Sequence, residues 1–186
     1  MATLINADTS NGLKLTSDTS GIIQLQSGGT TKATVNSSGL TSPGHILQVL
    51  QSVKTDTFST TSQTLVDVSD LSVAITPSST SSKILVHMDL MVAVSFHVGG
   101  LQLVRDTTNI YQGDAAGNRT RFTIAIGIPP SGDGYSQRSS AMFLDSPSTT
   151  SATTYSIEFC ATGNAATAYV QVYGVTSSIV LMEIAG

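Results

Sequence analysis

The sequence has few of the residues on which many protein functions depend. Charged residues make up only 11% of its 186 residues, against about 25% in ordinary soluble domains. It has no tryptophan and a single cysteine, Cys160. One cysteine cannot form a disulfide within the chain, and strand-like flanking residues predict that this thiol is buried and structural. A disulfide framework and a cysteine-cluster metal site are therefore excluded.

Positive charge is scarce and scattered along the chain. Eight Lys and Arg residues stand against twelve Asp and Glu residues, which gives a net charge of −4. Nucleic-acid binding requires cations gathered on one face, so we expect no nucleic-acid partner. The longest apolar run, residues 88–94, is too short to span a membrane, and the N-terminus lacks a signal-peptide pattern. These features predict a protein that is made in a cytoplasm and is not inserted into a membrane.

No pattern typical of a catalytic, metal or cofactor site occurs. His45, His87 and His97 lack the spacing of metal-binding histidines, and neither phosphate-binding glycine loops nor a GxSxG motif is present. The only glutamates, Glu158 and Glu183, occur in strand-like stretches. We therefore expect no catalytic residue, no metal and no cofactor. A polysaccharide-degrading enzyme with paired carboxylates is the remaining enzymatic alternative.

Hydroxyl groups replace the missing charge. The chain has 27 Ser and 26 Thr, together 53 of 186 residues, and 40% of its residues are hydrophobic. This composition favours strands and turns over helices. Short alternating strands recur from Ile46 onward, and the most apolar of them, residues 83–95, is predicted to be central. About eight to ten such strands predict an all-β, antiparallel, jelly-roll-like β-sandwich over residues 46–186.

Turn-forming residues predict where these strands are interrupted. Asp67 and Asp70 are typical of a turn, and the pair Gly99-Gly100 predicts a bulge or hairpin. Proline, glycine and hydroxyl residues mark two further loops, residues 129–134 and 146–154.

Polar and aromatic side chains offer candidate contact sites in this region. The most polar cluster consists of Asp114, Asn118, Arg119 and Arg121. It predicts either a solvated loop with local ion pairs or a loop that contacts a subunit or a glycan. Tyrosines can stack on sugars, although the absence of tryptophan weakens a carbohydrate platform. The tyrosines are Tyr111, Tyr135, Tyr155, Tyr169 and Tyr173.

The first forty residues follow a different pattern. They contain three short alternating segments, residues 12–15, 22–26 and 32–36, separated or closed by glycines. Each segment has too few apolar side chains to bury a core within one chain, and so thin a ribbon is marginal in water. We therefore predict that its apolar residues contact other copies of the chain or another protein. These candidate interaction residues are Leu13, Leu15, Ile23, Leu25 and Val35.

The chain accordingly divides into three parts. Residues 1–40 are predicted to form a slender N-terminal β arm for oligomerisation or docking. Pro43 and Gly44 punctuate a hinge at residues 41–45, and residues 46–186 form the β-sandwich domain.

Several blocks of sequence resemble a known family. In the arm they are DTSNGLKL at 8–15, GIIQLQ at 21–26 and ATVNSSGL at 33–40; in the body they are TFSTT at 57–61, ITPSS at 75–79, SKILV at 82–86 and FLDSP at 143–147. These blocks resemble small tail-fibre-like and head-decoration virion proteins of marine tailed bacteriophages.

The resemblance implies a non-enzymatic structural protein located in the virion and made in the host cytoplasm. Such proteins are commonly homotrimers with a slender N-terminal part and a globular β-rich head. The implied partners are further copies of the chain, other capsid or tail proteins and, for a tail-fibre tip, a host surface glycan. The matched blocks contain no family site residues, so the resemblance assigns none.

Overall fold

The computed structural model describes residues 20–37, 39–95, 97–127 and 135–186. The chain divides into two compact units, Met1–His45 and Ile46–Gly186. In the described residues every strand pair is antiparallel and there is no helix, which confirms the predicted all-β fold.

The first unit contains one three-stranded sheet in the order β1-β2-β3. Its strands are β1 (Ile23–Ser27), β2 (Thr30–Asn36) and β3 (Gly39–Thr41). Gly28 and Gly29 connect the first two strands, and both have positive φ, of 58° and 75°, a conformation that glycine adopts without steric cost. The predicted segments at 22–26 and 32–36 therefore pair as a hairpin. The segment at 12–15 lies outside the described residues.

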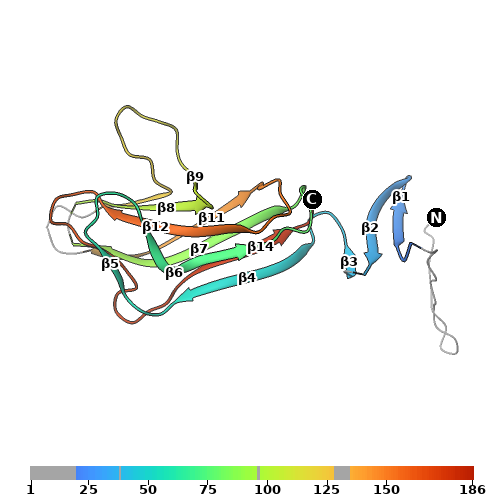
Figure 1. The fold of residues 1–186 in the computed structure, drawn as a ribbon, viewed down its shortest axis with the longest axis horizontal. Helices are drawn as coiled ribbons and strands as arrows, with labels where there is room; N and C mark the ends of the chain where they lie inside the picture. Colours follow the sequence, from blue (N-terminus) through green and yellow to red (C-terminus); the bar gives the residue numbers. More distant parts are fainter. Residues whose placement is uncertain (1–19, 38, 96, 128–134) are drawn as a thin grey trace. The chain divides into compact units, whose positions relative to one another are not determined.

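The second unit, which we call the body, contains two sheets that run lengthwise through it (Figure 1). One sheet has the order β10-β8-β12-β6, with β9 paired to β8; the other has the order β4-β14-β7-β13-β5, with β11 paired to β7. The strands are β4 (Ile46–Lys54), β5 (Phe58–Thr60), β6 (Val66–Ile75), β7 (Lys83–Val94), β8 (Gly99–Arg105), β9 (Thr108–Ile110), β10 (Ile124–Ile126), β11 (Tyr135–Asp145), β12 (Thr153–Ala161), β13 (Ala168–Val170) and β14 (Ser177–Ile184).

Strand β7 is central to the six-stranded sheet, as its apolar sequence predicts. It pairs with β11 along one edge, and with β14 and then β13 along the other. Every second side chain from Ile84 to Val92 is buried, because alternate residues of a strand point to opposite faces. These side chains meet a layer from the other sheet that includes Leu103, Ile157 and Phe159. The core thus lies between the two sheets, in a β-sandwich-like arrangement.

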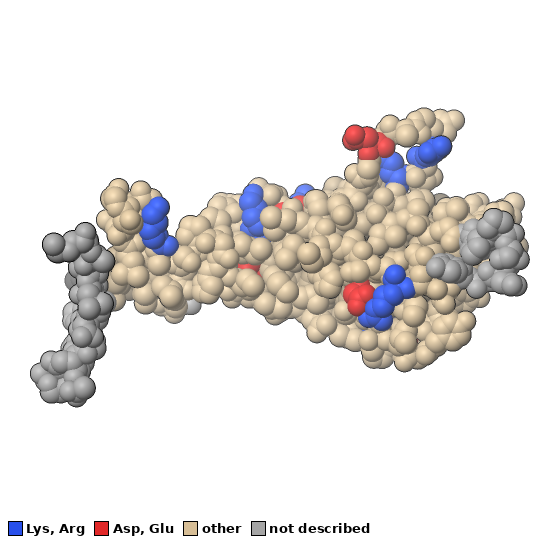
Figure 2. Space-filling model, turned by 180° about the vertical axis from the view of Figure 1, so that it is seen from behind, with Lys and Arg blue, Asp and Glu red and all other residues tan. Residues whose placement is uncertain are grey.

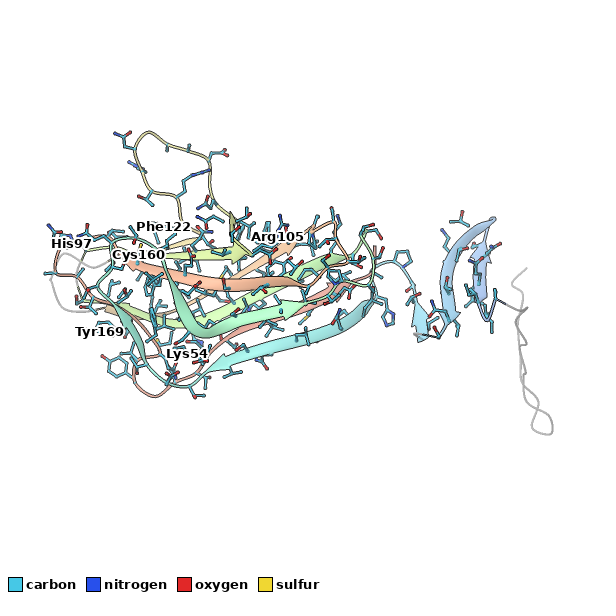
Figure 3. The ribbon with its side chains drawn as sticks, in the orientation of Figure 1. Lys54, His97, Arg105, Phe122, Cys160 and Tyr169 are labelled. Carbon is cyan, nitrogen blue, oxygen red and sulfur yellow. The ribbon has the colours of Figure 1, made fainter. Side chains whose placement is uncertain are left out.

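The predicted turn at Asp67 and Asp70 is wrong, because both residues lie inside the single strand β6. An irregularity in the pairing with β12 interrupts the register, and Asp70 has a φ of 62°. A β-bulge of this kind redirects one side chain without ending the strand. Asp70 thereby reaches the fully buried Lys54, whose Nζ lies 3.7 Å from Asp70 Oδ2 and 2.8 Å from Asp56 Oδ1 (Figure 3).

The predicted interruption at Gly99 and Gly100 is also wrong, since both residues are buried within β8. A Cβ atom at Gly100 would overlap the ring of Phe122, and one at Gly99 would meet Val94 and Phe159. Glycine is thus required here because neighbouring side chains pack directly against the backbone. A glycine pair in the sequence is expected both at a β-bulge and where a side chain packs against the backbone. Only the packing in the structure distinguishes these two cases.

Candidate interaction surfaces

The six-stranded sheet carries a row of apolar side chains on the side that faces away from the core. Val49 lies opposite Met182, Met182 opposite Leu85, and Leu85 opposite Leu144. Directly opposed residues of antiparallel strands share a face and pack together. The row therefore crosses four strands, and its outer members Val49 and Leu144 are 54% and 52% exposed.

A second row beside the first is half apolar. It consists of Gln51, Val180, His87 and Met142, in the same strand order. Met142 is 59% exposed, and His87 Nε2 lies 3.1 Å from Ser140 Oγ. We call the six apolar residues of these rows the outer apolar face: Val49, Leu85, Met142, Leu144, Val180 and Met182.

Among the described residues, one ion pair lies on this side of the sheet, and it joins two side chains of the same chain. Arg138 Nε donates to Asp89 Oδ1 at 2.8 Å, in a two-pronged pair. This hydrogen bonding lowers the pKa of the Asp89 carboxyl below its usual value, against a small opposing effect of burial. On the face shown in Figure 2, Lys, Arg, Asp and Glu occur in a few small groups on a largely uncharged surface.

The predicted interaction residues come together on one face of the β1-β2-β3 sheet. Ile23 lies opposite Val35, Leu25 opposite Ala33, and Val35 opposite Leu40. Leu25 and Leu40 are about half exposed, at 48% and 54%. Leu40, which was not singled out from the sequence, joins the set through the register of β3. Leu13 and Leu15 lie outside the described residues.

The candidate nucleophile and metal ligands do not assemble into a site. Cys160 is buried in β12, and burial raises the pKa of its thiol, which disfavours the reactive thiolate. His87 contacts a hydroxyl, while His45 and His97 lie in connecting segments. Among the described residues, no group of three His, Cys, Asp or Glu side chains is arranged to hold a metal ion.

The two glutamates lie in different sheets and therefore do not form a catalytic pair. Glu183, in β14, accepts hydrogen bonds from the backbone N and Oγ of Ser78, both at 2.7 Å, from Ser82 Oγ at 2.7 Å and from Gln48 Nε2 at 2.6 Å. Burial raises the pKa of Glu183, but these four bonds outweigh it, and the net pKa is lowered. Glu183 is thus a structural acceptor that ties the β6–β7 connection to β14 and β4.

Glu158 has a different neighbour that the sequence did not reveal. It lies directly opposite Asp67 on β6, on a face of the five-stranded sheet. Burial raises the pKa of Glu158, and the nearby Asp67 carboxyl raises it further. Since register cannot be read from a single strand, this carboxylate pair was not predicted.

The polar cluster of residues 114–121 belongs to a loop between β9 and β10 that projects from the body (Figure 1). Its four predicted members are exposed, and none of the ion pairs in the described part of the chain involves Asp114, Arg119 or Arg121. The base of the loop is fixed by the Tyr111 ring, which stacks on Phe143 with centroids 4.8 Å apart. In the single chain the cluster is therefore exposed on a fixed base, without the expected ion pairs among the described residues, and its contact with a subunit or a glycan stays a prediction.

The second predicted loop, residues 146–154, lies at the end of the body where the chain enters β4. At this end of the body, Asp145 pairs with Ile84, and Ile184 pairs with both Lys83 and Ile46 on the neighbouring strands. The loop lines a hollow of about 320 Å³ with Arg105, Asp106 and Thr108. Residues 129–134 lie outside the described residues.

Comparison with known proteins assigns the chain to no family: no family model matches it, and no curated protein does. The described residues include no helix that is long and apolar enough to cross a membrane.

Proposed function

We propose that this chain is a non-enzymatic structural protein of a phage virion and that it assembles as a homotrimer. The observation that carries the proposal is the outer apolar face, which a single chain leaves exposed to water. Monomeric proteins rarely expose apolar patches beyond about 300–600 Å², and larger ones usually mark interaction sites. The virion context is supported by the sequence blocks that resemble tail-fibre-like and head-decoration proteins.

A further copy of the same chain is the occupant that this face suits best. The six residues of the face are uncharged, and beside them Asp89 and Arg138 neutralise each other. Lys83, at the margin of the face, donates a hydrogen bond to Ser146 Oγ and forms none of the ion pairs in the described part of the chain. Copies of this face can therefore meet at a shared three-fold axis provided that Lys83 stays hydrated at the margin, because a charge buried alone would cost of the order of 3–5 kcal/mol. Around a shared axis the residues of each copy cover those of its neighbours.

The N-terminal unit supports the same proposal by a separate route. Its three-stranded sheet exposes Leu25, Val35 and Leu40, and a sheet this small is marginal without a partner. We propose that residues 1–40 form a slender arm that packs against other copies or docks the trimer onto the particle. The body has its own core and does not require the arm in order to fold.

A jelly-roll topology for the body is part of this proposal. Long strands alternate between the sheets along the sequence: β4, β7, β11 and β14 lie in one sheet, and β6, β8 and β12 in the other. Such alternation is expected when two Greek keys wrap into a double-sheet jelly roll.

Placement on the particle separates two versions of the proposal. As a head-decoration protein the chain would bind capsid subunits in many copies, and as a tail fibre it would occur in a few trimers. Quantifying the protein per purified particle distinguishes them, since a high copy number excludes a tail fibre and a few trimers exclude shell decoration.

Deletion of residues 1–40 tests the docking role. The shortened protein should remain folded but be absent from purified particles, whereas normal incorporation would contradict docking by the arm. Incubation with host polysaccharide tests the rival enzymatic function. Release of sugar by the wild type, lost in Glu158→Gln, would favour a hydrolase over a structural protein.

A further inference from the structure

A five-residue loop separates two interior strands, β13 and β14, which pair one after the other with the same edge of β7. Strands β13 and β14 both pair with this edge, and residues 172–176 leave it between them. Both backbone groups of Met91 remain satisfied across the gap: Gln171 N donates to Met91 O at 2.8 Å, and Met91 N donates to Ser177 Oγ at 2.9 Å. The loop is therefore a closed insertion and not a frayed strand end.

Side chains from two other segments of the body hold the base of this loop. Thr57 Oγ1 donates to the carbonyl of Gln171 at 2.8 Å, and Arg138 Nη1 donates to the carbonyl of Thr176 at 3.2 Å. Gln171 and Ser177, which border the loop, are both buried. A base fixed on both sides restricts the positions open to the loop's tip.

The loop and the residue that precedes it contain strained backbone, and the tip carries an exposed aromatic ring. Gln171, Tyr173 and Gly174 have positive φ values of 67°, 64° and 67°. For the two residues with side chains this region costs of the order of 1–3 kcal/mol each. The side chain of Tyr173 is 81% exposed. Strain combined with an exposed ring indicates that the loop presents Tyr173 to a ligand.

Tyr173 stands beside a pocket of about 190 Å³. Figure 3 shows Tyr169, which also lines it, near the same end of the body as His97. The other lining residues are aliphatic or carry hydroxyls, and none of the described ones is charged. The lining includes Ala93, Val172, Ser95, Ser136, Tyr169 and Tyr173.

We propose that this pocket binds one ring of a neutral saccharide, with the ring stacked on Tyr173. A pyranose has an apolar face of C–H groups and a rim of hydroxyls, which match a tyrosine ring and nearby serine hydroxyls. The lack of a lining Lys or Arg disfavours phosphorylated or acidic sugars. The volume lies below the roughly 300–1,000 Å³ of pockets that enclose a drug-sized ligand, so only a single ring enters.

One part of this inference rests on the proposed virion role: the assignment of the sugar to a host surface glycan. The binding itself is a property of the body. The assembly proposal and the saccharide proposal therefore succeed or fail in separate measurements.

Saturation-transfer NMR with the full-length protein tests the pocket. The probes are the methyl glycosides of glucose, galactose, mannose and N-acetylglucosamine, with methyl glucuronide as the charged comparison. We expect saturable binding of at least one neutral glycoside, weakened about three- to tenfold in Tyr173→Ala. Tyr173→Phe keeps the ring and should bind like the wild type.

Tyr111→Ala is the matched control, because Tyr111 is also exposed, at 41%, and also has a positive φ, of 56°. This variant should bind like the wild type. The proposal is overturned if no neutral glycoside binds, if Tyr173→Ala binds as well as the wild type while its melting temperature is unchanged, or if the glucuronide binds more tightly than the glucoside. Sedimentation of the same samples reports the oligomeric state separately.

Discussion

Leu144 of β11 lies directly opposite Leu85 of β7, on the side of the sheet that faces away from the core. Leu144 is nevertheless 52% exposed, because no strand of the described body covers that side. The pair continues into Met182 and Val49 on the neighbouring strands. Covering such a row in water contributes roughly 25 cal/mol per Å² of apolar surface, and this gain is the physical basis of the proposed assembly.

Charge placed on the outer apolar face should prevent assembly without unfolding the body. In the double variant Met142→Asp, Leu144→Asp, both side chains are more than half exposed in the single chain, so unfolding free energy should change by about 1 kcal/mol or less. In the assembly the carboxylates would be buried without partners. We expect the sedimenting species to fall to the mass of one chain at micromolar concentration.

Val98→Asp is the matched control for that experiment, because Val98 is an exposed apolar residue, at 37%, outside the outer apolar face. It should assemble like the wild type. Equal dissociation of both variants would mean that added charge acts generally, and the outer apolar face would then not be the contact.

Removing the first unit should leave the body folded. A chain of residues 46–186 retains all the strands of both body sheets and the entire buried core. Its thermal unfolding should remain cooperative, with a melting temperature within about 4 °C of the full-length value, which corresponds to roughly 1 kcal/mol or less. Loss of the unfolding transition would show that the arm contributes to the core.

Replacing Glu183 should be strongly destabilising near neutral pH. In Glu183→Gln one carboxylate oxygen becomes an NH₂, so either the Ser78 and Ser82 donors or the Gln48 amide loses its acceptor, at a cost of about 2–4 kcal/mol. The pKa of Glu183 is lowered in the folded state, so its stabilisation is present above the usual glutamate pKa of about 4.3. It is lost as pH falls through the lowered value. Chemical denaturation at pH 7 and pH 3 should show a smaller difference at pH 3.

Glu158→Gln should have the opposite effect. The pKa of Glu158 is raised in the folded state, so ionisation above that pKa destabilises the wild type, and the neutral amide avoids this cost. At pH 7 the variant should have a higher melting temperature than the wild type. At pH 4, where the carboxyl is protonated, the two melting temperatures should be equal. A lower melting temperature at pH 7 would contradict the assignment.

Gly100→Ala should destabilise the body by about 1–3 kcal/mol, because its methyl group would overlap the Phe122 ring. In the double variant with Phe122→Ala, the loss of unfolding free energy should be smaller than the sum of the losses in the two single variants. The reason is that the methyl group added at position 100 would no longer meet the Phe122 ring. Gly113→Ala is the control, because nothing lies within 4 Å of a Cβ there. Its unfolding free energy should stay within about 0.5 kcal/mol of the wild type.

The fold class was predictable because it depends on alternation within single strands. The pattern of residues 83–95 identifies β7, because its alternate apolar residues form the face that is buried against the other sheet. The two wrong interruptions have a common cause. Asp70 and Gly99-Gly100 carry the composition of turns, yet Asp70 forms a bulge directed at Lys54 and the glycines admit Phe122, Val94 and Phe159. Those contacts join residues distant in sequence.

The candidate surfaces were predictable only in part, for the same reason. Ile23, Leu25 and Val35 were found because their hairpin is local. The outer apolar face combines residues from four strands between Val49 and Met182, and its existence depends on register across the sheet. Tyr173 was visible as one of five tyrosines, but its exposure follows from a loop closed around Met91.

The mass of the full-length protein in solution tests the central claim most directly. Sedimentation equilibrium at micromolar concentration should give a species of three chains, each of 19.2 kDa. A single species at the mass of one chain, unchanged as concentration rises, would contradict the proposed homotrimer.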